Sequence, residues 1–276
     1  MELSLEIKKS IRRHEPVEAE GLTLYPILTG DWEEFQTAKP AIEFMHQSLP
    51  VALVGMPLLP ALYRLDIEAL IETGEVVGLY QRTLQFLALS LRLGAGMKMR
   101  ERLRLFRTVV DPKDPAKLLY ISFWANGNEE CRITPVMYSR LRYILAAQNG
   151  LKIPSENANP ELVQAQRDMA EANGPELDYD FDTLRTALAA FSHCDEAELD
   201  AWPVKKFLDR YAAYERALRY LLCGIAEAQG GKWKGGNPYP SAFYDRLESG
   251  SDALMPIGEF AGGEAAKAVM NAMGAS

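Results

Sequence analysis

The pattern of apolar and polar positions divides the chain into a first half that mixes strands with helices and a second half that is helical. Short alternating runs indicate two strands around Glu20-Gly21 and a three-stranded meander. The first strand of the meander is expected within MRERLRLFRTVV (99–110), and Asn126-Gly127-Asn128 is expected to be its second turn. From residue 134 onward the apolar spacing is helical. The pattern therefore predicts a mainly α-helical α+β fold, with small antiparallel β elements in the N-terminal half and a helical bundle in the C-terminal half.

Capping residues mark the predicted helices of the second half. Thr134-Pro135, Asn159-Pro160, Asp180 and Asp195 each place a side-chain acceptor at a helix start. The longest helix is expected to begin at Pro203, and its apolar face must pack on other elements, most simply on the preceding helices. Its apolar positions are Val204, Phe207, Leu208, Tyr211, Tyr214, Leu218, Leu221, Leu222 and Ile225. Helices are also expected from Asp31 to about Met45, over 57–71 and over 76–93.

Regular periodicity ends near Gln229, and residues 230–276 hold nine of the chain's twenty glycines. We therefore expect an N-terminal α+β region (1–134), a helical region (135–229) and a Gly-rich flexible tail (230–276). Aromatic side chains are costly to leave in water, so the aromatic residues of this tail are expected to dock on the chain's own domain or on a partner. The apolar, proline-broken segment 51–59 is a second candidate docking surface. The candidate partner-binding residues are Val54, Met56, Leu58, Leu59, Trp233, Tyr239, Phe243 and Tyr244.

Composition narrows the classes of partner. The 276 residues are 48% hydrophobic and 25% charged, as in ordinary globular proteins, and the net charge of −8 disfavours nucleic acid and anionic membranes. The apolar stretch 76–93 contains Arg82 and Arg92, so we expect a buried helix rather than a membrane span. No apolar run follows the basic N-terminus, so we expect no secretory signal. Three widely spaced cysteines favour a reducing compartment, and a cytoplasmic location is predicted.

No recognisable catalytic motif is present. The chain has no phosphate-binding loop and no nucleophile elbow, and its three histidines are isolated. Adjacent His193 and Cys194 point apart on a helix and are a poor metal pair. The run Asp178–Asp182 resembles the start of a calcium loop, but Thr183 and Ala189 stand where such a loop needs glycine and glutamate. The sequence therefore predicts no catalytic residue, no metal site and no cofactor.

Charge is unevenly distributed along the chain. Residues 92–107 contain six basic residues and one acid, whereas residues 171–200 contain nine acids and Arg185. The two regions can neutralise each other within one molecule or between subunits, which would make the protein a homo-oligomer. The alternation of Arg100, Arg102 and Arg104 favours a solvated strand face over a nucleic-acid face. A helix-turn-helix over 181–219 is disfavoured by its acidic surroundings.

Several segments together resemble a known family. They are GLTLYPILTGDWEEF, MPLLPALY, ITPVMYSRLRYILAAQNGL, ENANPELVQAQ, LDYDFDTLRTALAAF, AWPVKKFLDRYAAYERAL, GIAEAQGG and KGGNPYPSAFYDR. This arrangement resembles the tail assembly chaperones encoded in the tail modules of phages and prophages of Gram-positive bacteria. The resemblance spans nearly the whole chain.

The resemblance implies a non-enzymatic function in the cytoplasm of a bacterial host. Such chaperones bind the long helical tape-measure protein, keep it soluble and help tail-tube subunits polymerise around it. They are generally absent from the finished particle, and some have a frameshift-extended form, to which residues 230–276 would correspond. The alternatives are a structural tail or connector component retained in the virion and, from another class, an enzyme whose site is assembled from scattered residues.

Overall fold

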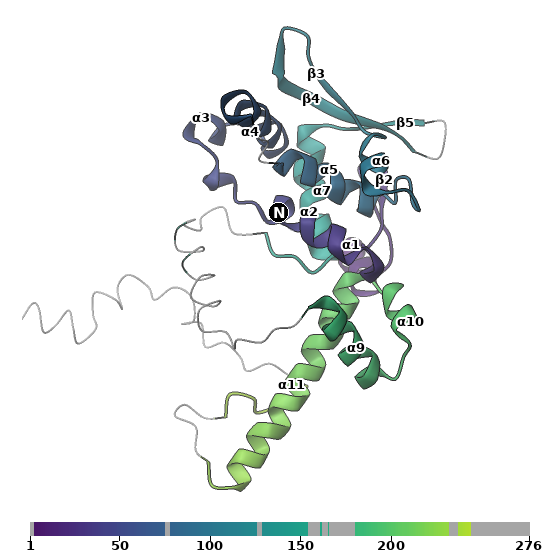
Figure 1. The fold of residues 1–276 in the computed structure, drawn as a ribbon, viewed down its shortest axis with the longest axis vertical. Coiled ribbons are helices and arrows are strands. Elements are labelled where there is room, and N and C mark those ends of the chain that lie inside the picture. The colour runs from purple at the N-terminus through teal and green to yellow at the C-terminus, as the bar shows by residue number, and fades with distance from the viewer. Residues whose placement is uncertain are drawn as a thin grey trace, which may run out of the picture. The chain divides into compact units, whose positions relative to one another are not determined.

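The computed structural model describes residues 3–74, 78–125, 129–153, 161, 165, 180–231 and 237–243. The chain divides into two compact units, residues 1–211 and 212–276. The division falls at residue 211, whereas the sequence pattern placed boundaries at 134 and 229. The fold is α+β and mainly helical, with two small antiparallel sheets, as the sequence predicted (Figure 1).

The helices before residue 134 are α1 (Leu5–Arg12), α2 (Trp32–Glu43), α3 (Val51–Val54), α4 (Leu58–Thr73), α5 (Leu79–Ser90) and α6 (Met99–Leu103). They are followed by α7 (Pro135–Gln148), α9 (Phe181–Ser192), α10 (Glu196–Asp200) and α11 (Val204–Ala228). Short 3-10 turns lie at Thr29–Asp31 and His46–Ser48. The predicted helix at Asn159-Pro160 lies outside the described residues, apart from Glu161 and Ala165.

The two sheets follow the predicted strand pairing. Strands β1 (Val17–Ala19) and β2 (Leu22–Leu24) pair across Glu20 and Gly21, which both have the positive φ that a two-residue hairpin turn requires. Strands β3 (Arg107–Asp111), β4 (Asp114–Ala125) and β5 (Glu129–Ile133) form an antiparallel sheet in the order β3-β4-β5. The predicted turn at 126–128 lies outside the described residues.

One hydrophobic core holds helices α1 to α7 to this second sheet. Helix α5 is deeply buried, as expected for the apolar stretch, and α7 contributes Tyr138 and Leu141 to the same core. At the end of α7, the Asn149 side chain accepts a hydrogen bond from the Ile27 N–H at 2.9 Å. Gln148 donates to the Leu24 carbonyl at 3.0 Å. These bonds satisfy buried backbone groups and fix α7 to the N-terminal hairpin.

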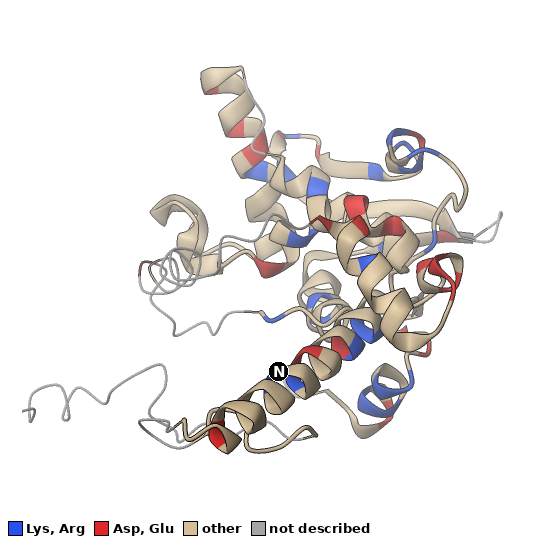
Figure 2. Ribbon diagram, turned by 60° about the horizontal axis from the view of Figure 1, so that its bottom comes forward, with Lys and Arg blue, Asp and Glu red and all other residues tan. Residues whose placement is uncertain are grey.

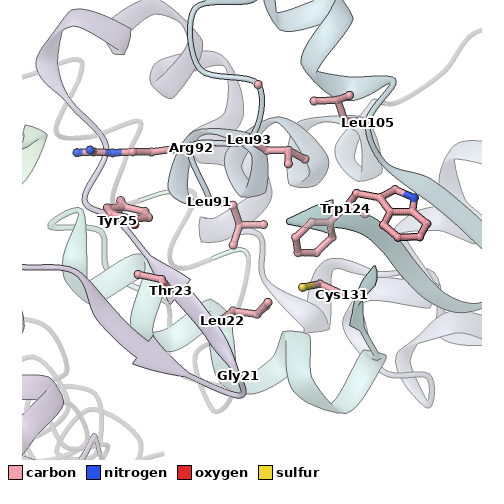
Figure 3. Close-up of a pocket in the computed structure, with 12 residues that line it drawn as sticks. Gly21, Leu22, Thr23, Tyr25, Leu91, Arg92, Leu93, Leu105, Trp124 and Cys131 are labelled. Atoms are coloured by element: carbon pink, nitrogen blue, oxygen red, sulfur yellow. The ribbon is translucent and has the colours of Figure 1, made fainter. Parts of the chain in front are cut away.

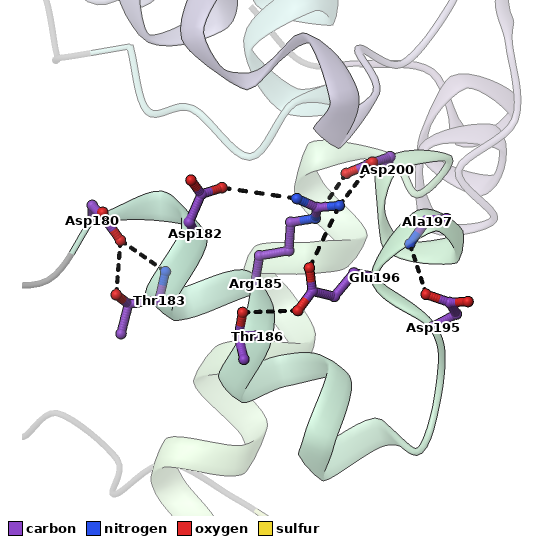
Figure 4. A network of polar contacts seen from close by, with 9 residues as sticks. All are labelled: Asp180, Asp182, Thr183, Arg185, Thr186, Asp195, Glu196, Ala197 and Asp200. Atoms are coloured by element: carbon purple, nitrogen blue, oxygen red, sulfur yellow. Dashed lines mark hydrogen bonds and ion pairs between the residues drawn. The ribbon is translucent and has the colours of Figure 1, made fainter.

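Three of the four helix caps predicted in the second half form as expected, and the fourth, Asn159, lies outside the described residues. Thr134 accepts from the Met137 N–H at 3.3 Å, Asp180 from the Thr183 N–H at 2.8 Å, and Asp195 from the Ala197 N–H at 3.3 Å. Figure 4 shows three acidic residues of this region around a single arginine. Arg185 forms ion pairs with Asp182, Glu196 and Asp200, at 3.8, 3.7 and 3.0 Å. The acids of α9 and α10 are therefore partly neutralised within their own unit.

The predicted strand over residues 99–110 is wrong in its first half. Residues Met99–Leu103 form helix α6, and the strand begins only at Arg107. Arg102 is 7% exposed, and its guanidinium donates to the Leu93 carbonyl at 2.8 Å and to the Ala88 carbonyl at 2.7 Å. Because these carbonyls lie at and beyond the end of α5, a tertiary contact overrides the local alternation. Arg100 and Arg104 are exposed, as predicted, but they lie on and just after a helix.

The sequence pattern also missed α1, whose start is capped by Ser4. Within the described residues, no helix is long and apolar enough to cross a membrane.

Candidate functional site

The predicted docking residues around α3 divide between surface and core. Val51 and Val54 are exposed on α3, and Met56 is half-buried. Leu58 and Leu59 were expected to face a partner, and this prediction is wrong. Both are buried in the hydrophobic core, because the first turn of α4 points inward. These two residues offer no surface to a partner.

The predicted tail residues also behave differently from one another. Arg219 of α11 lies over the ring of Tyr239, 5.3 Å from its centroid, and donates a hydrogen bond to the Tyr239 hydroxyl at 2.6 Å. Tyr239 therefore docks on α11 of the same chain. Docking on the chain itself was one of the two outcomes expected from the sequence, and docking on a partner was the other. Phe243 is 82% exposed. Trp233 and Tyr244 lie outside the described residues.

The C-terminal half of α11 carries an exposed apolar row. Alternating steps of three and four residues lead from Val204 through Phe207 and onward to Ile225, which is the spacing of a helix–helix seam. Val204 and Phe207 are fully buried, so the prediction that the apolar face of this helix packs on other elements is confirmed for the first turns of α11. Farther along the helix, four side chains are 44–64% exposed, and we call them the α11 apolar face. They are Leu218, Leu221, Leu222 and Ile225.

A groove in the first unit was not predicted from the sequence. Its cavity has a volume of about 520 Å³. Figure 3 shows that one wall comes from β2, one from the connection after α5, and one from the sheet at Trp124 and Cys131. A second hollow of about 420 Å³ shares Leu105, Phe123 and Trp124 with the first and extends to Arg104 and Arg107. We call these two adjoining hollows the Trp124 groove.

Trp124 is the most conspicuous side chain of this groove. It belongs to both hollows and is 61% exposed, although tryptophan is usually well buried in folded proteins. The neighbouring Leu105 is also exposed, whereas Phe123, which precedes Trp124 in β4 and lines both hollows, is buried. The groove thus has an apolar floor and an accessible aromatic side chain, the combination found at the anchoring points of protein interfaces.

Arg92 reaches the groove from a strained backbone position. The Leu93 N–H bonds to the Ala88 carbonyl and the Arg92 N–H to the Leu89 carbonyl, so the end of α5 is closed by a Schellman motif. Arg92 occupies the left-handed position of this motif, with φ of 50°, where glycine is usual. A side chain there costs about 1 kcal/mol. The Arg92 guanidinium lies over the Tyr25 ring, 4.5 Å from its centroid, at the rim of the groove.

The groove has a positive rim. Arg92, Arg104 and Arg107 are exposed, and none of them forms an ion pair with another described residue. Glu130 lines the second hollow, but it pairs with Arg132 at 3.0 Å. Basic and acidic positions are interspersed along most of the rest of the described ribbon, as Figure 2 shows, and acids predominate in residues 180–200. A positively charged, partly apolar groove therefore stands out on a chain whose net charge is −8.

Sequence reasoning missed this groove because its walls are distant in the chain. They come from residues 21–25, 91–94, 104–107, 122–124 and 130–131. The one local signal was the excess of basic residues between 92 and 107, which does not reveal their alignment with Trp124.

No group of three His, Cys, Asp or Glu side chains in the described part of the chain could hold a metal ion. Comparison of the chain with models of protein families, with curated proteins and with solved structures finds no match.

Proposed function

We propose that the protein is a non-enzymatic assembly chaperone that binds helical segments of a phage tape-measure protein. The observation that supports this function is the α11 apolar face. Exposed leucine and isoleucine side chains at helix–helix spacing form a surface onto which an amphipathic helix packs. A long helical client, as the resemblance to tail assembly chaperones implies, would offer many such segments.

The size of this face suits reversible binding. Complete burial of a Leu or Ile side chain contributes about 1.5–3 kcal/mol relative to full exposure. The four side chains are about half exposed, so covering them contributes on the order of 5 kcal/mol before the entropic cost of association. A single contact of this kind is weak. A chaperone that must release its client during tail assembly needs such contacts, and several along one client would retain it.

Co-expression with the tape-measure protein from the same genome tests the proposal. We expect the client to stay soluble and to co-purify with the wild-type chain. The double variant Leu221→Glu/Ile225→Glu should lose at least nine-tenths of the bound client, because it places charges in the seam. Ala213→Glu is the matched control, since Ala213 is exposed on the other side of α11. Circular dichroism of each variant verifies that the helix content is unchanged.

Two results would count against the proposal. Equal retention of the client by the wild type and the double variant would exclude the α11 apolar face as the binding surface. Finding the protein in purified virions at a fixed copy number would instead identify it as a structural tail component.

A further inference from the structure

We propose that the Trp124 groove is a second docking site, which takes an extended acidic segment of a partner protein with an apolar side chain seated against Trp124. This inference does not depend on the tape-measure client or on the α11 apolar face. It rests on the composition of the groove, on its charge and on the strands that border it.

The apolar part of the groove selects the anchor. Trp124 and Leu105 are exposed, Phe123 is buried, and all three line both hollows, whose volumes are about 520 and 420 Å³. Each hollow is large enough for a leucine or an aromatic side chain, and covering an exposed tryptophan is a strong source of interface affinity. The anchor of the partner is therefore a large apolar residue.

The rim selects the charge of the partner. Arg92 lines the first hollow, Arg104 and Arg107 line the second, and none of the three has an ion-pair partner among the described residues. A guanidinium binds a carboxylate with two parallel hydrogen bonds, and such bonds are strong in a partly apolar groove. The backbone of Arg92 supports this assignment further. Its φ of 50° is left-handed, and a glycine would be easier to accommodate there. An arginine at such a position is consistent with a use for its side chain.

A nucleic acid also carries negative charge, but it fits the groove less well. The chain as a whole has a net charge of −8, which repels a polyanion outside the groove. The second aromatic side chain at the rim, Tyr25, is covered by Arg92 and is not open for base stacking. A short acidic peptide avoids both difficulties because it contacts the groove alone.

The borders of the groove favour an extended partner. Leu22 and Thr23 on one side belong to β2 of a two-stranded sheet, and Cys131 on the other belongs to β5. Both β2 and β5 are edge strands, and an edge strand presents unpaired N–H and C=O groups that an added segment can bind. Apolar side chains of an extended segment would alternate with its carboxylates, which places one set on the floor and the other at the rim.

The probe is a fluorescein-labelled peptide, PELDYDFD, which reproduces residues 175–182 of this sequence and alternates acidic with apolar side chains. We expect the full-length protein to raise its fluorescence anisotropy with a dissociation constant in the micromolar range. Raising the salt from about 50 to about 500 mM should weaken binding, because the rim arginines are exposed. The neutral peptide PQLNYNFN should bind at least tenfold more weakly.

Arg92→Gly is the decisive variant, because glycine suits the left-handed position and the fold should tolerate it. We expect Arg92→Gly and Arg104→Gln/Arg107→Gln each to weaken binding about tenfold or more. Arg100→Gln is the matched control, since Arg100 is exposed but does not line the groove.

The proposal is overturned if the acidic peptide does not bind or if the neutral peptide binds equally well. It is also overturned if Arg92→Gly has no more effect than Arg100→Gln. A single-stranded oligonucleotide that displaces the peptide and binds more tightly would assign the groove to nucleic acid instead. The peptide assay tests only the Trp124 groove, and the client assay with the α11 double variant tests only the α11 apolar face. Either proposal can therefore fail without the other.

Discussion

Replacing Arg102 by methionine distinguishes the solvated strand that the sequence predicts for residues 99–104 from the buried Arg102 that the structure shows. The alternation in the sequence makes Arg100, Arg102 and Arg104 equivalent side chains on a solvated strand. In the structure only Arg102 is buried, and it joins the end of α5 to α6 through the carbonyls of Ala88 and Leu93. Methionine retains most of the aliphatic stem but removes both donors, so the variant isolates the hydrogen bonds.

The expected loss follows from these bonds. A hydrogen bond to a charged group contributes about 1.5–3 kcal/mol, and a buried carbonyl left without a donor costs about 1–3 kcal/mol. The Ala88 carbonyl keeps the Leu93 N–H at 3.0 Å, so only the Leu93 carbonyl loses its recorded donor completely. Arg102→Met should therefore lower the free energy of unfolding by about 2–4 kcal/mol.

Urea denaturation followed by circular dichroism measures this change. Arg100→Met is the matched control on the same helix, and its exposed side chain should cost no more than about 0.5 kcal/mol. If the two variants have the same stability within that margin, the Arg102 side chain is solvated and the tertiary role assigned to it is wrong. Replacement of a buried charge by a well-packed apolar side chain can itself be stabilising, and a more stable Arg102→Met would equally refute the reasoning.

Two further predictions concern the partly buried His14 and the buried Asp66. Burial and the nearby Lys205 lower the pKa of His14 below its ordinary value of 6.5. Below that pH the unfolded chain binds a proton that the folded chain resists, so stability should fall as the pH decreases from about 7.5 to 5.5, and His14→Asn should flatten this dependence in urea titrations. An unchanged slope would exclude this role for His14. Separately, the Asp66 carboxylate accepts the N–H groups of Leu79 and Tyr80 at 3.2 and 3.0 Å, so Asp66→Ala should cost about 1–3 kcal/mol. The exposed Glu72→Ala on the same helix should cost little, and equal melting temperatures would contradict the capping role.

The Trp124 groove shows why sequence reasoning finds local features more readily than sites. Trp124 lies in a run of strand-forming residues, and the strand was predicted, but its exposure depends on what packs above β4. Leu58 and Leu59 show the opposite error, since an apolar run after a proline looks like a docking surface until its helix is packed. In both cases the neighbours that decide exposure are distant in the chain.

Features that depend on a few consecutive residues could be predicted from the sequence. Thr134, Asp180 and Asp195 cap the helices they were expected to cap, and Glu20-Gly21 makes the hairpin turn, because each bond or dihedral angle involved lies within one turn of the chain. The apolar spacing of α11 was equally evident. Tertiary structure alone decided that Val204 is buried while Leu221 is exposed. It also decided that Arg102 bonds to the end of another helix and that Arg92 reaches the rim of the Trp124 groove. Burial and charge pairing depend on surfaces that meet only in the folded chain, and no periodicity along the sequence specifies which surfaces those are.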